Sequence, residues 1–223
     1  MKEELINYLE SFILESRKQT LDKVLSCRTR YITFVLEDLF QPHNASAVLR
    51  SCDCFGIQDI HIIENKNKYA PNIEIAMGSE QWLTLKKYNK LEHNSKLALN
   101  ELKNQGYRII ATSLKPKSIA LNDFDLNKGK CAIVFGTELT GISDVVTEMA
   151  DEFITITMVG FTESLNISVA AALIAQNLTD RLRNSDLNWQ IPNIEKLDIK
   201  LTWLRNSIKK VNLIERRFFE KMQ

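Results

Sequence analysis

The sequence predicts an α/β protein with a mainly parallel sheet and helices on both of its faces. Short runs of apolar and β-branched residues alternate along the chain with longer segments of helical periodicity, which is the pattern of strand–helix–strand units. The chain has 223 residues and is 44% hydrophobic, so it can bury a substantial core. The sequence contains no internal repeat and no low-complexity segment.

In the first part of the chain, apolar and charged residues recur at helical spacing, and we expect one amphipathic helix over residues 3–25. The compact apolar run 31–36 predicts a buried strand. A turn then leads to Asn44, a good N-cap, and to a helix of about a dozen residues that ends near Gly56. Residues 60–63 form the next predicted strand.

The same alternation continues to the end of the chain. The predicted elements are a helix near 92–105 closed by Gly106, strands at 107–112, 131–135 and 153–157, a long Ala-rich helix over 165–183, and a final amphipathic helix over 198–221. We therefore expect a helical extension at 1–25, one α/β domain at 26–184, and a basic helical extension at 185–223.

The formal net charge of +1 is unevenly distributed. Residues 181–223 contain ten Lys or Arg and five Asp or Glu, a local charge of +5, which leaves −4 for the other 180 residues. Residues 16–30 are also basic, with Asp22 as their only acid. Basic ends around an acidic middle favour a protein that grips a phosphate backbone at its periphery. An ordinary solvated helix face explains the same charges, so charge alone leaves the question open.

Several classes of protein are disfavoured by the sequence. The chain begins without a basic segment followed by an apolar run, and it has no uncharged apolar stretch of about eighteen residues, so we expect a cytoplasmic protein that spans no membrane. The four Cys lack CxxC spacing and obvious partners, so we predict no metal. Ile142 stands where a P-loop beginning at Gly136 requires Lys, and no GxGxxG occurs, which excludes two common phosphate-binding motifs.

Ligands of a parallel α/β sheet bind beyond the carboxyl ends of its strands. The loops expected at those ends are rich in polar residues. They comprise residues 43–50, the pair Thr112 and Ser113, residues 136–143 and residues 158–168. We therefore expect one site where these loops meet.

Three of these loops carry motifs that are familiar in combination. Asn44 is followed six residues later by Arg50, Phe135-Gly136-Thr137-Glu138 is followed by Gly141-Ile142-Ser143, and the third motif is Ser164-Leu165-Asn166-Ile167-Ser168-Val169-Ala170. With these motifs, almost the whole chain resembles the tRNA ribose 2′-O-methyltransferases of the SPOUT, or trefoil-knot, class. The short N-terminal helix and the basic C-terminal helix resemble the branch that modifies the D-loop guanosine at position 18. Thr157 is a departure, because the family usually has Pro there.

The resemblance implies S-adenosylmethionine as cofactor, tRNA as partner, a homodimer, and a deep trefoil knot at the C-terminal side of the α/β domain. The residues implied in catalysis are Asn44, Arg50, Glu138, Ser164 and Asn166. The residues implied in cofactor binding are Thr112, Gly136, Ile156, Met158 and Leu165. RNA contacts are expected from the basic ends, at Arg17, Lys18, Arg28, Arg30, Arg205, Lys209 and Lys210.

Methyl transfer from a sulfonium is an in-line displacement, so the protein mainly positions the reactants and activates a weakly acidic hydroxyl. We expect Arg50 to reach the same end of the sheet as Asn44 and to clamp a phosphate beside the target ribose. A guanidinium stays protonated, so the proton leaves to phosphate or water. An ion pair with Asp53 is the alternative role for Arg50.

The other motif residues also have two readings each. Glu138 is expected to order its loop or neighbouring Ser and Asn residues, whereas a mere Glu near the start of a helix at 142–149 is the alternative. Either Ser164 or Asn166 can cap the long helix while the other contacts the ribose. Leu165, with Ile156 and Met158, is expected to form apolar walls for the adenine.

Three other functions stay open at this point. The same fold could methylate a ribose in ribosomal RNA, or it could be an RNA-binding module that has lost catalysis. A small-molecule α/β enzyme is the third alternative, and it predicts no salt-dependent affinity for tRNA.

Overall fold

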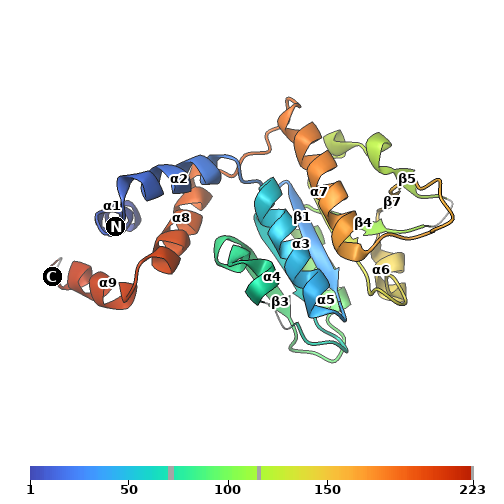
Figure 1. Cartoon of the computed structure of the whole chain (residues 1–223), viewed down its shortest axis with the longest axis horizontal. Coiled ribbons are helices and arrows are strands. Elements are labelled where there is room, and N and C mark those ends of the chain that lie inside the picture. Colours follow the sequence, from blue (N-terminus) through green and yellow to red (C-terminus); the bar gives the residue numbers. More distant parts are fainter. Residues whose placement is uncertain (70–72, 115–116, 222–223) are drawn as a thin grey trace. The chain divides into compact units, whose positions relative to one another are not determined.

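The computed structural model describes residues 1–69, 73–114 and 117–221. The chain forms two compact units. One is the segment Thr29–Trp189, and the other is a helical unit in which Met1–Arg28 joins Gln190–Gln223. The segment Thr29–Trp189 is a layered structure with helices on both faces of a sheet, as Figure 1 shows.

Within the described residues the sheet has seven strands in the order β3-β2-β1-β6-β4-β7-β5, and every strand pair is parallel. The strands are β1 Ile32–Glu37, β2 Asp59–Ile63, β3 Thr84–Tyr88, β4 Arg108–Thr112, β5 Ile119–Ala120, β6 Cys131–Phe135 and β7 Glu152–Thr155. The strands expected at 31–36, 60–63, 107–112, 131–135 and 153–157 are confirmed, with small shifts of their ends. The predicted parallel α/β class is confirmed as well.

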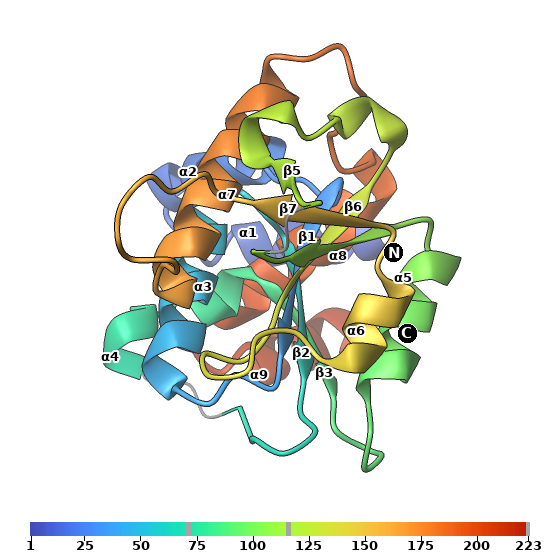
Figure 2. The same ribbon diagram turned by 90° about the vertical axis from the view of Figure 1, so that its right-hand side faces the viewer.

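The helices of this unit lie on opposite faces of the sheet (Figure 2). They are α3 Pro42–Phe55, α4 Ile73–Ala76, α5 Ser95–Asn104, α6 Asp144–Met149 and α7 Ile167–Arg183, with short 3-10 helices η1 Ser79–Trp82, η2 Leu121–Asp123 and η3 Leu126–Lys128. Side chains of β1 alternate between the two faces. Phe34 and Leu36 pack in the core that includes α3 and α7, while Val35 packs in the core that includes α5 and α6. Both faces are therefore covered, which explains the continuous apolar runs.

Two edge strands were missed by the sequence pattern. β3 has the sequence TLKKY, in which Thr84, Lys86 and Lys87 are exposed, and such polar edge strands carry little apolar signal. β5 is only two residues long. β3 pairs only with β2 and β5 only with β7, so both are edge strands of the described sheet. Missing them therefore did not change the predicted interior of the sheet.

In the helical unit, two of the predicted helices are each divided into two. The single helix expected over 3–25 is two helices, α1 Lys2–Glu10 and α2 Glu15–Ser26, and the single helix expected over 198–221 is α8 Asn193–Ser207 and α9 Val211–Glu220. The first break contains Leu14, which has an extended backbone with ψ 146°. The second contains Lys210, which has a left-handed backbone with φ 57°. Apolar spacing continues across both breaks, so periodicity alone did not reveal them. In the described ranges, the helices lack the combination of length and apolar sequence that a membrane span requires.

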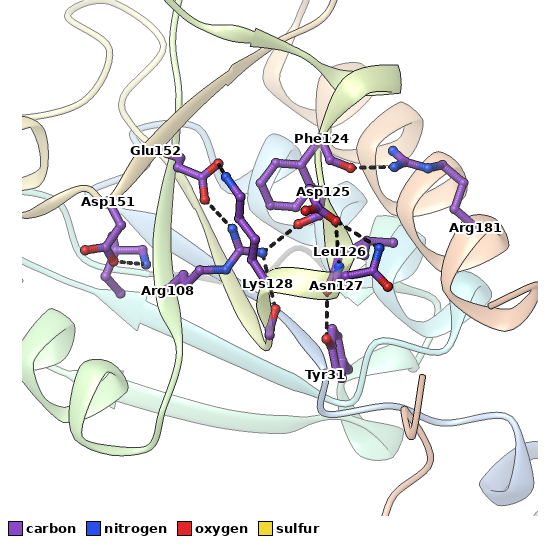
Figure 3. Close-up of polar contacts among 12 residues, drawn as sticks. Tyr31, Arg108, Phe124, Asp125, Leu126, Asn127, Lys128, Asp151, Glu152 and Arg181 are labelled. Carbon is purple, nitrogen blue, oxygen red and sulfur yellow. Dashed lines mark hydrogen bonds and ion pairs between the residues drawn. The ribbon is translucent and has the colours of Figure 1, made fainter. Parts of the chain in front are cut away.

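Two arginines bind the segment 121–130, Arg108 from the start of β4 and Arg181 from α7 (Figure 3). The guanidinium of Arg108 pairs with Glu152, donates to the carbonyl of Asp125 at 2.9 Å, and lies 5.1 Å from the centre of the Phe124 ring. Arg181 of α7 donates to the carbonyls of Leu121, at 2.9 Å, and of Phe124. The segment has little regular structure of its own, so these side chains supply partners for its backbone.

Arg108→Met should lower the free energy of unfolding by about 1–3 kcal/mol, because the Asp125 carbonyl loses this donor and the mostly buried Glu152 keeps its ion pair with the more exposed Lys128 but loses Arg108. Urea unfolding of the purified protein measures this loss. Lys103→Met is the matched control, since Lys103 pairs with Asp151 through more exposed side chains and should cost under about 1 kcal/mol. Equal losses in the two variants would contradict the role given to Arg108.

Candidate active site

A cavity of about 840 Å³ lies at the carboxyl ends of β4, β6 and β7. Its lining comes from the ends of these strands, from the loops that follow them and from the first turns of α3 and α7. The sequence-predicted site residues in the lining are Asn44, Thr112, Gly136, Glu138, Ile156, Met158, Ser164, Leu165 and Asn166. The sequence argument thus brought together four of its five catalytic candidates and all five of its cofactor candidates. Arg50 is the exception.

The segment 136–143, which we call the cofactor loop, forms a tight turn after β6. The backbone N–H of Thr137 donates to the carbonyl of Gly141 at 2.9 Å, and the N–H of Gly141 donates back at 3.0 Å. A Cβ atom on Gly136 would lie 2.2 Å from the carbonyl group of Gly141, so only glycine fits at this position. Gly141 itself has φ 71°, in the left-handed region. The two glycines of the motif therefore set the shape of the loop.

Asn44 is in the first turn of α3 and is not its N-cap. The helix begins earlier than expected because Pro42 occupies a first-turn position, and Gln41 is the N-cap. This frees the buried Asn44 amide for other contacts. Its amide nitrogen donates to Glu138 at 2.8 Å, and its oxygen accepts from the Asn166 amide at 3.1 Å. Asn44 thereby links the cofactor loop to the start of α7.

Asn166 has the capping role that was predicted for either Ser164 or Asn166. Its side-chain oxygen accepts from the backbone N–H of Ser168 at 2.8 Å, at the start of α7. Because the same side chain donates to Asn44 through its nitrogen, the orientation of the amide is fixed at both ends. Ser164 is exposed and lines the cavity.

The carboxylate of Glu138 receives donors from the start of α3. It accepts from the backbone N–H of Phe40 at 3.1 Å and of Gln41 at 3.3 Å, in addition to Asn44. Partial burial acts to raise the pKa of Glu138, but these hydrogen bonds outweigh it and hold the pKa below its usual value of 4.5. Glu138 is consequently ionised near neutral pH. Through these contacts Glu138 orders the start of α3, including Asn44, which agrees with the ordering role expected for it.

The cavity has chemical features that suit S-adenosylmethionine. Ile156, Met158 and Leu165 supply apolar lining of the kind that adenine needs. The described lining also contains the acids Glu138 and Asp144 and no Lys or Arg. An acidic lining complements a ligand whose sulfonium is positively charged. Among the described residues, no group of three His, Cys, Asp or Glu side chains is placed to hold a metal ion.

Arg50 does not line this cavity, which corrects the expectation that it reaches the site with Asn44. It is an exposed residue of α3. Six residues along a helix correspond to a rotation of about 600°, so the Arg50 side chain leaves the axis about 120° away from that of Asn44. Asn44 and Arg50, the two ends of the motif, therefore lie on different faces of α3, and in one chain only Asn44 lines the described cavity.

The expected RNA-binding residues differ in their surroundings. Arg28 is 1% exposed, with its guanidinium 5.3 Å from the centre of the Trp203 ring, so the expectation that it contacts RNA is wrong for this structure. Arg30 pairs with Asp59, Lys18 with Glu10 and Arg205 with Glu215. Arg17, Lys209 and Lys210 have exposed side chains.

Several cavity residues were missed by the sequence argument. Gln41, Leu139, Asp144 and Thr147 line the cavity but were not singled out. Leu139 lies inside a loop that was already identified, so taking every residue of the loop would have found it. Asp144 and Thr147 belong to α6, and only the fold places the first turns of that helix beside the cavity.

Glu138→Gln should lower the free energy of unfolding at neutral pH by about 1–2 kcal/mol, because a neutral amide accepts the same N–H donors more weakly. The folded-state pKa of Glu138 is depressed, so its stabilisation is present above about the usual value of 4.5 and is lost as the pH falls through the folded-state pKa. Urea unfolding of both proteins at a series of pH values measures this convergence.

Glu163→Gln is the control for this prediction, because Glu163 is an exposed acid in the loop that precedes α7. It should change stability little at any pH. A difference between wild type and Glu138→Gln that stays constant as the pH is lowered would contradict the assigned contacts.

The chain is similar to known proteins over most of its length. Residues 31–176 match the SpoU rRNA Methylase family. The chain is 46% identical over 210 residues to the tRNA (guanosine(18)-2′-O)-methyltransferase of Borreliella burgdorferi, which covers 94% of each protein. It is similar to the crystal structure of the Aquifex aeolicus TrmH/SpoU tRNA modifying enzyme, with a TM-score of 0.76, 29% identity, and coverage of 88% of this chain and 98% of that one.

A more distant structure shows the fold with its ligand. The SpoU methyltransferase AviRb from Streptomyces viridochromogenes, solved in complex with the cofactor AdoMet, is 18% identical with a TM-score of 0.60 and covers 74% of this chain and 65% of that one. The family match extends over most of the α/β unit and includes all three motif loops. On the family match and the extent of the 46% identity, this chain belongs to the SpoU rRNA methylase family.

Proposed function

We propose that this protein transfers a methyl group from S-adenosylmethionine to the 2′-hydroxyl of a ribose in tRNA, with the D-loop guanosine at position 18 as its target. The observation that carries the proposal is the joining of the three motif loops at one cavity through Glu138, Asn44 and Asn166. Near-full-length identity of 46% to a protein of that named activity supports the choice of substrate.

The cofactor, when bound, supplies a methyl group on a positively charged sulfur. Leu165, Ile156 and Met158 form the apolar walls against the adenine, and Thr112 and Gly136 line the same cavity. The two acids of the lining favour a cationic ligand. Because an in-line displacement depends on alignment, the main contribution of these residues is to hold the two reactants in register and to exclude water.

Ser164 and the Asn44–Asn166 pair face the place where the target ribose would enter. Both amides of the pair are already hydrogen-bonded, so they are preorganised and lose little freedom when substrate binds. Ser164 supplies a hydroxyl for the ribose. The proton of the 2′-hydroxyl is proposed to leave to phosphate or water, because a guanidinium stays protonated and the Glu138 carboxylate already accepts three hydrogen bonds.

The phosphate beside the target ribose needs a cation that the described lining of one chain does not contain. We assign this role to Arg50 of a second copy in a homodimer. An apolar stripe supports the dimer: Val169 and Leu173 are four residues apart on α7 and are 47% and 45% exposed. A second copy packed against this stripe would remove its apolar side chains from water, which favours association. The trefoil knot implied by the family likewise stays a prediction.

The helical unit is proposed to hold the tRNA outside the cavity. Arg17, Lys209 and Lys210 are exposed there, and a basic surface binds phosphates without reading sequence. The ion pairs of Lys18 and Arg205 can exchange their carboxylate for a phosphate only by losing an existing partner. Lys209 and Lys210, which are exposed in the helical unit, are therefore the stronger candidates.

Incubation of the purified protein with unmodified tRNA and isotope-labelled S-adenosylmethionine should produce 2′-O-methylguanosine at position 18, detected by mass spectrometry of nucleosides and of nuclease fragments. Transfer only to ribosomal RNA that lacks the tRNA elbow would favour the ribosomal alternative. Binding of tRNA without transfer would favour a non-catalytic module, and no salt-dependent tRNA affinity would favour a small-molecule enzyme.

The assignment of Arg50 to a partner's site predicts complementation between two inactive variants. Arg50→Ala should reduce methylation by about 100-fold or more while keeping cofactor affinity, since it removes a charged group that acts on the substrate. Leu165→Arg should fail at cofactor binding because it places a charge in an apolar wall. Co-expressed with different affinity tags, the two should form a mixed dimer with one complete site and about half of the wild-type activity.

Light scattering shows whether the mixed species is a dimer, and titration calorimetry shows whether the Arg50→Ala protein binds S-adenosylmethionine. An inactive mixed dimer would place Arg50 in the site of its own chain. A monomeric wild-type protein with full activity would remove the shared site altogether.

A further inference from the structure

A second carboxylate, that of Glu37, binds the end of the cofactor loop at Ser143, whereas Glu138 lies near the start of the same loop. Glu37 is the last residue of β1 and is 2% exposed. It accepts from the hydroxyl of Ser143 at 2.8 Å and from the Ser143 backbone N–H at 3.1 Å. Ser143 ends the cofactor loop, so Glu37 fixes the point where the loop becomes α6.

We propose that Glu37 is a positioning residue that holds the cofactor loop in the shape that binds S-adenosylmethionine. The inference rests on the cofactor site of the proposed function. Glu37 does not line the cavity, and neither does Ser143. Any effect of Glu37 on the cofactor must therefore pass through the loop.

The cofactor loop and the segment between β1 and α3 each contribute one carboxylate that binds the other. Glu37, at the start of the segment that leads to α3, binds Ser143 of the cofactor loop. Glu138 of the cofactor loop binds the backbone of Phe40 and Gln41 in the segment that leads to α3. Each loop is thus tied to the other at two separate points, which restricts sliding and rotation more than one contact would. Such a reciprocal tie is expected where two loops must present a fixed surface to a ligand.

The surroundings of Glu37 explain how a carboxylate is tolerated there. The hydroxyl of Ser95, the first residue of α5, donates to it at 2.5 Å. Ser143 is the N-cap of α6, where its own oxygen accepts from the N–H of Val146. Glu37 therefore contacts the first residue of α5 and the N-cap residue of α6. Three donors also satisfy its buried oxygens.

Ser95 and Ser143 make a matched pair, because each donates a hydroxyl to the same carboxylate oxygen. Ser143 belongs to the cofactor loop and Ser95 to a helix on the far side of Glu37. Because the Ser143 hydroxyl also caps α6, Ser143→Ala is compared with Glu37→Gln, which leaves that cap in place. A role for Glu37 in stability alone predicts similar exchange of the loop amides in Glu37→Gln and Ser95→Ala. A positioning role predicts that only the removal of the Ser143 hydroxyl loosens the loop.

The experiment compares Ser143→Ala, Ser95→Ala and Glu37→Gln in the full-length protein. Titration calorimetry should show S-adenosylmethionine affinity about tenfold weaker in Ser143→Ala and Glu37→Gln, the fold-change expected for losing one hydrogen bond to a charged group. Ser95→Ala should stay within about twofold of wild type. Hydrogen exchange of the amides in 137–142 should be faster in the first two variants and unchanged in Ser95→Ala.

Hydrogen exchange decides the inference without any ligand. Equal exchange of the loop amides in the Glu37→Gln and Ser95→Ala proteins would overturn it, whether or not the wild type binds S-adenosylmethionine. A wild-type protein that fails to bind the cofactor would instead overturn the proposed function. Unchanged cofactor affinity in Ser143→Ala, with normal wild-type binding, would also overturn the positioning role.

Combining Glu37→Gln with Glu138→Gln separates the reciprocal tie from two independent effects. If both carboxylates hold the same pair of loops, the loss of cofactor affinity in the double variant should be smaller than the product of the two single losses. Multiplying losses would show that the two residues act separately and would overturn the tie. Melting temperatures of all variants identify any that fail to fold, for which Glu37→Asp is the substitute.

Discussion

The hydrogen bond between the Glu138 carboxylate and the Asn44 amide, at 2.8 Å, joins segments that are 94 residues apart in the chain. Each partner has a second task that depends on the bond. Glu138 also satisfies backbone donors at the start of α3, and Asn44 also holds Asn166 at the start of α7. An amide has distinct donor and acceptor ends, so the order Glu138, Asn44, Asn166 can be assembled in only one sense. The cavity walls are consequently fixed relative to one another before any ligand arrives.

This arrangement is possible because the sheet is parallel. Parallel strands end at the same edge, so the loops after β1, β4, β6 and β7 converge without any special sequence. The special sequence is needed only to lock the loops once they have met. Gly136 permits the tight turn of the cofactor loop, and the buried Glu37 anchors its far end. The polar residues of the motifs therefore serve the loops as much as they serve the chemistry.

The sequence predicted the sheet interior and most of the cavity, because buried strands have continuous apolar runs and the motif loops follow them directly. It was less informative where a feature depends on a few backbone angles. The breaks near Leu14 and Lys210 interrupt helices without interrupting their apolar spacing. Asn44 is a good capping residue by type, yet Pro42 starts the helix earlier and leaves the amide for Glu138. The exchange of carboxylates between two loops could not be read from a pattern, because its partners are about 100 residues apart.

The charge of the described cavity lining bears on the proposed dimer. The described lining of the cavity holds two acids and no Lys or Arg, which suits a cationic methyl donor but repels the phosphates on either side of a ribose. Positive charge at the rim would offset that repulsion if it lies within about a Debye length at physiological ionic strength. Arg50 is exposed on α3 and lies outside the lining of its own cavity, while the apolar stripe of Val169 and Leu173 is on α7, the helix whose Ala170 lines the cavity. A second copy that covers the stripe would be placed to bring a guanidinium to that rim. In the proposed dimer, association of the two copies and recognition of the substrate would then be coupled, because an apolar contact would bring the positive charge that the described lining lacks.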